Sequence, residues 1–242
     1  WDDLVRAADE TYVEFRPTYF VSSNPHSLPN LLSGQALKHQ EEILAFVQDV
    51  NPENLLEEWA ALSAGRTSWA ATADDLAAAG AKANFFYYAQ RAYLRNRDDL
   101  QREWVQAERA AGIHRFDEPH ALDIGAQVIE LRELDPARLD PRLAVPGLEL
   151  LRKSKALIVN VDYPLGFAAY HLLSQVATST TDLAGVYVMG KAASLNGRVG
   201  DVMIPNVVYD EHSRNTFLFK NTFLSQHVAP YLRYGTVFDN QK

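Results

Sequence analysis

Cysteine is absent from this chain of 242 residues, and long apolar runs are absent as well. Without cysteine there are no disulfide scaffolds, thiol nucleophiles, iron–sulfur clusters or cysteine-based zinc sites. The best apolar run, residues 156–161, is far shorter than the roughly 18 to 20 residues of a membrane-spanning helix. Basic residues are also few, since 23 Lys and Arg stand against 31 Asp and Glu, a net charge of −8. That balance argues against a nucleic-acid partner bound through bulk charge.

The composition is that of a folded globular protein, with 47% hydrophobic and 11% aromatic residues. A chain of this length can bury a core in one large domain or two small ones. The seven histidines lack the spacing of a metal site, and the motifs of serine hydrolases, P-loop enzymes and Rossmann oxidoreductases are missing. The first twenty residues do not have the pattern of a signal peptide. We therefore expect a cytoplasmic protein with no membrane partner and no metal.

The chain begins at Trp1 without an initiator methionine and stops soon after an apolar run, residues 234–238. That run has the pattern of a strand without a following element. We expect the chain to be a fragment of a longer protein.

Residues 1–115 have the pattern of helices. Apolar residues that stand seven, eleven and fourteen positions after Ala36 predict an amphipathic helix over 36–50. This helix is expected to end at the Asn51-Pro52 pair. A second helix is expected over 53–63, and a long alanine-rich helical segment over 72–112 with a break near 96–98. The apolar face of the first helix comprises Ala36, Ile43, Val47 and Val50.

Within the long helical segment lies an aromatic group that covers more than one helix face. It consists of Phe85, Phe86, Tyr87, Tyr88 and Tyr93. We interpret it as core together with an interface, which favours a homo-oligomer, in preference to a platform for stacking a ligand.

Residues 116–150 form a connector that is rich in proline and contains one short expected strand, 127–131. In residues 151–242 the apolar residues follow a different spacing from that of the helical region. A short helix over 147–154 leads to two apolar runs, 155–161 and 185–189, which predict strands buried on both faces. The helix expected between them makes a βαβ unit with parallel strands. The sequence thus predicts an α/β fold, in which ligands bind at the carboxyl ends of the strands.

The second strand leads into Gly190, Lys191 and Ala192. A glycine and small residues after a buried strand let the backbone approach a ligand, and consecutive N–H groups can hold an anion. Lys191 adds a cation beside them. An anion site and a tight turn chosen for packing are about equally compatible with these residues alone.

Several segments resemble the nucleoside phosphorylase and nucleosidase superfamily, of the purine nucleoside and uridine phosphorylase type. Residues 164–169 open a helix where that family has a Gly-x-Gly-x-x-x-Ala turn. The strand end at Gly190, followed by the Val-Gly-Asp-Val-Met-Ile-Pro run of 199–205, is similar to the family's Gly-x-Ala-Gly-Gly-Leu and Val-Gly-Asp-Val-Val-Ile segments. Residues 234–238 resemble a later strand of the same fold. The resemblance covers about residues 155–242.

The resemblance implies an αβα layered domain that cleaves the N-glycosidic bond of a nucleoside or nucleotide, as a phosphorylase or an N-ribosyl hydrolase. It implies no cofactor, with phosphate as the co-substrate of phosphorolysis. Lys191 falls in the phosphate-contacting loop, where the family usually has Ser or Thr. Val188 stands where some members carry an Arg, and Ala193 replaces a Gly. The family's ribose-binding Glu cluster and its base-contacting acid lie beyond the last strand of this chain, so no catalytic residue is assigned.

Further candidates for substrate contact follow the strands or lie in a loop. Asp162 stands at a strand end, where its carboxylate can bind a substrate hydroxyl, although an Asp before a turn more often bonds its own backbone. Asp201, after a glycine, is expected to hold its loop by accepting backbone N–H bonds. The remaining candidates are Tyr163, Gly166, His212 and Arg214, the last two in a hairpin loop over 210–215.

Two functions remain open. The first is N-glycosidic cleavage in a nucleoside phosphorylase-like domain preceded by a helical region. The alternative is a non-catalytic protein of the same fold that senses nucleotides or assembles oligomers. The partner expected in both cases is a small nucleoside or nucleotide.

Overall fold

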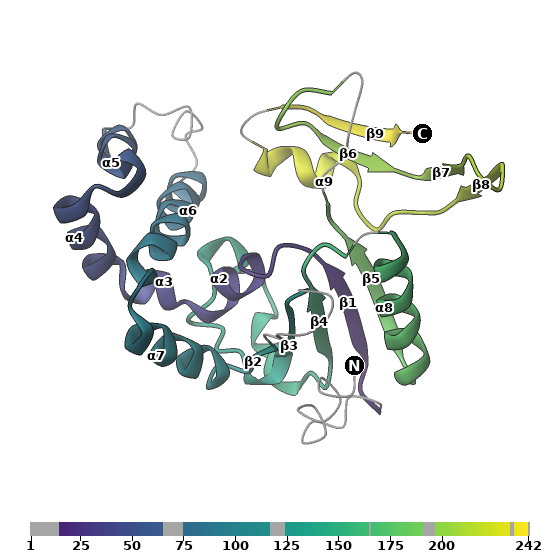
Figure 1. Ribbon diagram of the computed structural model, residues 1–242, viewed down its shortest axis with the longest axis horizontal. Helices are drawn as coiled ribbons and strands as arrows, with labels where there is room; N and C mark the ends of the chain where they lie inside the picture. Colours follow the sequence, from purple (N-terminus) through teal and green to yellow (C-terminus); the bar gives the residue numbers. More distant parts are fainter. Residues whose placement is uncertain are drawn as a thin grey trace. The chain divides into compact units, whose positions relative to one another are not determined.

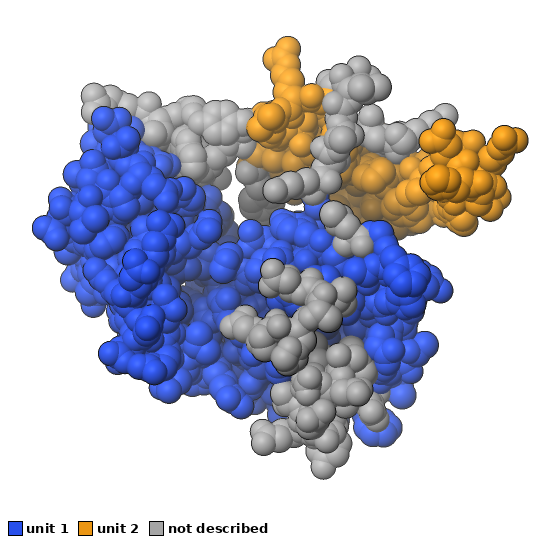
Figure 2. Space-filling model, in the orientation of Figure 1, with its two compact units in different colours: residues 1–190 blue, residues 191–242 orange. Residues whose placement is uncertain are grey.

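The computed structural model describes residues 15–64, 75–116, 124–164, 166–190, 197–232 and 235–241. The protein is a mixed α/β protein with a mixed sheet. Its chain forms two compact units, residues 1–190 and 191–242 (Figure 2).

The first unit contains a five-stranded sheet in the order β2-β3-β4-β1-β5 (Figure 1). Strand β1 runs parallel to both of its neighbours, whereas β3 runs antiparallel to β4 and to β2. The predicted βαβ unit is therefore present, but β1 lies between its two strands. The bounds are β1 Thr18–Ser22, β2 Ile113–Phe116, β3 Ala126–Glu130, β4 Leu157–Val161 and β5 Leu183–Val188.

The central position of β1 corrects the expectation that residues 1–115 are helical throughout. Residues 18–22 read Thr-Tyr-Phe-Val-Ser, a β-branched and aromatic run between Pro17 and Pro25. This composition favours a strand, but five residues are too few to show a period. Strand β2, at the end of the same region, has four residues, which are also too few to show a period.

The two faces of the sheet are covered differently. Helix α8, Gly166–Ser179, packs Val176, Leu172 and Leu173 against Val159 and its neighbours on one face. On the other face lie α2 and three short 3₁₀ helices. These are η4 Leu131–Glu133, η5 Pro141–Leu143 and η6 Leu148–Lys153. The connector expected over 116–150 is thus part of the core and not a linker.

Strand β5 differs from its prediction as a strand buried on both faces. Its residues alternate between half-buried and exposed, and Val188 is 72% exposed. An alternation with a period of two means that one face of β5 is packed and the other is exposed, and β5 lies at the edge of the sheet with β1 as its one neighbour there. The run 155–161 behaves as predicted, because β4 lies between β3 and β1.

The remaining helices of the first unit form their own hydrophobic cluster. The helix expected over 36–50 is divided at His39, and Val50 of its expected apolar face is 55% exposed. The break predicted near 96–98 is confirmed. The elements are α2 Ser27–Ser33, α3 Gln35–Lys38, α4 Gln40–Val50, η3 Pro52–Asn54, α5 Leu55–Ser63, α6 Asp75–Leu94 and α7 Asp98–Arg109.

The aromatic group on α6 lies mainly in that cluster. Phe85, Phe86 and Tyr87 are buried, and Trp59 of α5 packs against both phenylalanine rings. Tyr88 is 49% exposed. The core interpretation is confirmed for the three buried rings.

The second unit contains two small sheets. Strands β6, Val202–Pro205, and β9, Val237–Gln241, pair in parallel. Strands β7, Val207–Asp210, and β8, Asn215–Leu218, form the expected antiparallel hairpin. Short helices α9, Ser225–Val228, and η7, Ala229–Tyr231, follow in the chain.

The expected role of Asp201 is confirmed. One carboxylate oxygen accepts from the backbone N–H of Arg198 at 2.6 Å, and the other from that of Thr236 at 2.7 Å. These backbone hydrogen bonds lower the pKa of Asp201. The carboxylate therefore ties the start of β6 to the start of β9.

The compact units divide the chain at a different place from the expected regions 1–115, 116–150 and 151–242. Strands β4 and β5 belong to the first unit because both pair with β1. Pairing between distant segments is the physical reason that a change of period near residue 115 is not a boundary between units.

Candidate functional site

The carboxyl ends of three parallel strands meet at one level of the sheet. Ser22, the last residue of β1, pairs with Val161 of β4 on one side and with Val188 of β5 on the other. The backbone N–H of Ser23 then donates to the Val161 carbonyl at 3.0 Å, and that of Met189 to the Ser22 carbonyl at 2.9 Å. The segments that follow the three strands consequently leave the sheet side by side, at the edge where α/β folds bind ligands.

Asp162, the first residue after β4, is half-buried, and its carboxylate accepts no hydrogen bond from any residue that the structure describes. The usual Asx turn uses the N–H group two residues on, but that residue is Pro164, which has none. The expectation that Asp162 bonds its own backbone is therefore not met among the described residues. Within the described part of the chain, no hydrogen bond occupies its carboxylate.

Tyr163, beside Asp162, has a positive φ of 33°. A tyrosine rarely adopts this backbone conformation, and such strain costs about 1–3 kcal/mol and concentrates at functional sites. Gly166 also has a positive φ, of 53°, and a Cβ added there would meet no atom within 4 Å. The turn between β4 and α8 is thus strained at one residue and open at another.

Gly190 follows β5 and is exposed, and a Cβ built on it would meet nothing within 4 Å. The space beside this glycine is open, as a ligand-binding bend requires. Lys191 and Ala192, the other two residues of the predicted anion site, lie outside the described residues.

His212 and Arg214 lie in the turn of the β7–β8 hairpin, in the second unit. Asp210 organises this turn, because its carboxylate accepts from the backbone N–H of His212 at 3.0 Å and from the hydroxyl of Ser213. Both candidates are exposed. This geometry accounts for the turn without a ligand.

A buried pair of amides, which the sequence did not reveal, positions the loop after β1. Asn160 of β4 donates to the Val21 carbonyl at 3.0 Å and to Oγ of Ser23 at 2.9 Å. Gln127 of β3 donates to Asn160 Oδ1 at 2.5 Å and to the Pro25 carbonyl at 3.0 Å. Both side chains are buried, so these hydrogen bonds are shielded from water.

The loop held in this way forms one wall of a cavity of ≈ 390 Å³. Asn24 and His26 contribute from the loop, Asn84 and Arg91 from α6, and Arg142 from η5. This volume falls within the range of small-molecule sites. None of these residues was singled out from the sequence, because they come from three distant segments and follow no common spacing.

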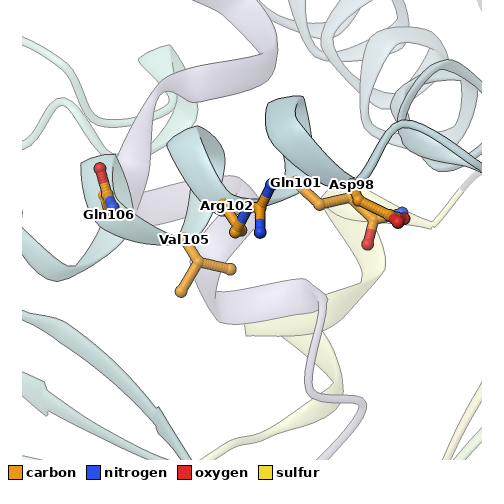
Figure 3. A pocket seen from close by; sticks show the side chains of 5 residues that line it. All are labelled: Asp98, Gln101, Arg102, Val105 and Gln106. Carbon is orange, nitrogen blue, oxygen red and sulfur yellow. The ribbon is translucent and has the colours of Figure 1, made fainter.

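A second hollow, of ≈ 400 Å³, lies along α7 (Figure 3). The five side chains that line it, from Asp98 to Gln106, all come from this one helix and are exposed. One helix cannot enclose a ligand, so we assign no site there. Among the described residues no group of three or more His, Asp or Glu side chains could hold a metal ion, and no helix there has the length and apolarity to cross a membrane.

The comparisons with known proteins place the chain in a family. The model of DUF6909, a family of unknown function, matches residues 1–242, so the chain belongs to that family. Neither the search of curated proteins nor the search of solved structures returned a match.

Proposed function

We propose that this protein binds a nucleoside or nucleotide at the carboxyl edge of the β4-β1-β5 strands and cleaves its N-glycosidic bond. The observation that carries the proposal is the meeting of the three strand ends at Ser22. This brings Asp162 and Gly190, two residues predicted separately, to the same edge of one sheet, on either side of β1.

The second unit supports the same proposal. Its Val-Gly-Asp-Val-Met-Ile-Pro run provides β6, and the segment that resembles a later strand of the superfamily leads into β9. The two strands pair in parallel, and Asp201 links their starts. Two of the segments that carry the resemblance are therefore neighbours in one small sheet.

The chemistry assigns different tasks to these groups. Cleavage passes through a sugar with oxocarbenium character, so the site must hold a phosphate ion or a water on one face of the ribose. The backbone at Gly190 and the ammonium group of Lys191 are our candidates for binding the anion. The carboxylate of Asp162 is our candidate for binding a hydroxyl of the sugar, because it has no described partner.

The test measures base release and binding together. The purified full-length protein is incubated with adenosine, inosine, uridine and adenosine monophosphate, with and without inorganic phosphate, and the free base is measured by chromatography. We expect base release, reduced at least tenfold in Asp162→Asn. Lys191→Ala should weaken phosphate or nucleotide binding by about tenfold or more, the value of one charge-assisted hydrogen bond.

Lys153→Ala is the matched control, because Lys153 is exposed on η6, away from the strand ends. It should leave binding and base release unchanged. Nucleotide binding without base release would favour the non-catalytic alternative. No binding of any of the four compounds would contradict both functions.

A further inference from the structure

We propose that the cavity between the β1–α2 loop and α6 is a binding site for a small phosphate monoester. The cavity is the one lined by Asn24, His26, Asn84, Arg91 and Arg142, with a volume of ≈ 390 Å³. This proposal stands without the nucleoside-cleaving function, because it rests on different residues.

Two amide side chains of the lining have a donor group to offer a ligand. Asn24 Oδ1 already accepts from the backbone N–H of His26 at 2.7 Å, and Asn84 Oδ1 from the Arg142 guanidinium at 3.0 Å. A backbone N–H and a guanidinium can only donate, so each amide must present its oxygen to that partner. Their Nδ2 groups are left as donors that have no partner among the described residues.

The charge of the lining is positive. Arg142 is neutralised by Asp140, whose two carboxylate oxygens accept hydrogen bonds from its guanidinium at 2.7 and 2.8 Å. Arg91 has no carboxylate within ion-pair distance in the described part of the chain, and no Asp or Glu is among the described lining residues. Among the described residues, the cavity therefore has one guanidinium, that of Arg91, which no carboxylate compensates.

The surroundings of His26 contain both arginines and carboxylates. Burial is the largest cause that lowers the pKa of its imidazole, and the guanidinium groups of Arg115 and Arg91 lower it further. Asp162 and Glu108 act in the opposite direction but do not reverse the shift. The charge of Arg91 therefore acts at His26, another residue of the lining.

The lining also selects among anions. A phosphoryl group of a monoester offers three terminal oxygens and a carboxylate two, so a phosphoryl group better matches a guanidinium, two amide donors and an imidazole. Leu31 and Tyr88 also line the cavity, and Tyr88 is 49% exposed. They provide apolar surface for the organic part of the ester.

The experiment measures binding of phenyl phosphate, inorganic phosphate, benzoate and benzyl alcohol to the full chain by isothermal titration calorimetry. We expect phenyl phosphate to bind most tightly and benzyl alcohol not to bind. Arg91→Gln should weaken phenyl phosphate binding by about tenfold or more. Arg102→Gln, a substitution of an exposed arginine on α7, should leave it unchanged.

Two further variants keep the fold and remove donors. Asn24→Asp and Asn84→Asp preserve the oxygen that accepts from His26 or Arg142, but each replaces an amide donor with a negative charge. Both should abolish phenyl phosphate binding, whereas Asn215→Asp in the exposed hairpin should not. Equal binding by these variants and the unmodified chain would overturn the proposal. So would tighter binding of benzoate or benzyl alcohol, or no saturation by phenyl phosphate up to about 10 mM.

Discussion

The side-chain amide of Asn160 donates a hydrogen bond to Oγ of Ser23 over 2.9 Å, between residues 137 positions apart in the chain. It joins the end of β4 to the loop that follows β1. Both residues are fully buried. One residue of each proposed site follows this contact in the chain, since Asp162 comes two residues after Asn160 and Asn24 comes directly after Ser23.

The first prediction concerns the stability that this contact provides. Asn160→Leu removes three buried hydrogen bonds, with the Val21 carbonyl, Ser23 and Gln127. Ser23 and Gln127 keep their bonds to the carbonyls of Asn24 and Pro25. Since each lost hydrogen bond contributes about 0.5–1.5 kcal/mol, we expect the free energy of unfolding to fall by about 2–4 kcal/mol, measured by urea denaturation.

Gln48→Leu is the control for the Asn160 variant. Gln48 is exposed on α4, so the same chemical change should alter the free energy of unfolding by less than about 0.5 kcal/mol. Similar values for the two variants would contradict the role given to Asn160.

A second prediction compares neighbouring tyrosines on α6. Tyr87 is buried and its hydroxyl donates to Asp140 at 2.7 Å, whereas the hydroxyl of Tyr88 donates to Glu53 at the surface. Tyr87→Phe should lower the free energy of unfolding by about 1.5–3 kcal/mol, because it removes a buried hydrogen bond to a charged group. Tyr88→Phe should change it by less than about 0.5 kcal/mol. Thermal unfolding of both variants provides the measurement, and equal effects would disprove the distinction.

The third prediction is a pH dependence. Burial alone would raise the pKa of Asp140, but hydrogen bonds from Arg142 and Tyr87 outweigh it, so the pKa lies below its usual value of 3.8. A carboxyl whose pKa is lowered by folding stabilises the protein above its unfolded pKa and loses that contribution as the pH falls through its folded pKa. We expect the unmodified chain to be more stable than Asp140→Asn at pH 7.

The same comparison at low pH supplies the check. The difference in free energy of unfolding between the unmodified chain and Asp140→Asn should shrink as the pH falls below about 4. Urea denaturation at pH 7, 5, 4 and 3 measures it. A difference that stays constant over this range would show that Asp140 does not titrate as described.

The parts of the fold that follow from sequence are those fixed by local pattern. The run 155–161 predicted β4 because apolar β-branched residues continue across it, and the hairpin at 210–215 followed from its turn residues. Strand β1 has five residues and takes its place only through pairing with β4 and β5, which no local pattern records.

The candidate sites divide in the same way. Asp162 and Gly190 could be predicted because each directly follows a recognisable strand, and strand ends in parallel sheets bind ligands. The cavity beside α6 could not, because Asn24 and Asn84 become free donors only through partners that the folded chain supplies. Asn160 lies inside an apolar run, and its function as a buried donor depends on Ser23.

The last prediction separates two effects of a side chain at a glycine. Gly34 and Gly147 both have positive φ, 66° and 86°, so alanine at either position is strained by about 1–2 kcal/mol. At Gly147 the nearest atom to an added Cβ is Cδ1 of Leu150 at 3.6 Å, an ordinary contact, but at Gly34 it is the Arg138 carbonyl oxygen at 2.3 Å. Since backbone must move at Gly34, Gly34→Ala should be less stable than Gly147→Ala by a further 1–3 kcal/mol or so in urea denaturation. An equal decrease in the free energy of unfolding for the two variants would mean that the backbone at Arg138 can move away from Gly34 without destabilising the fold.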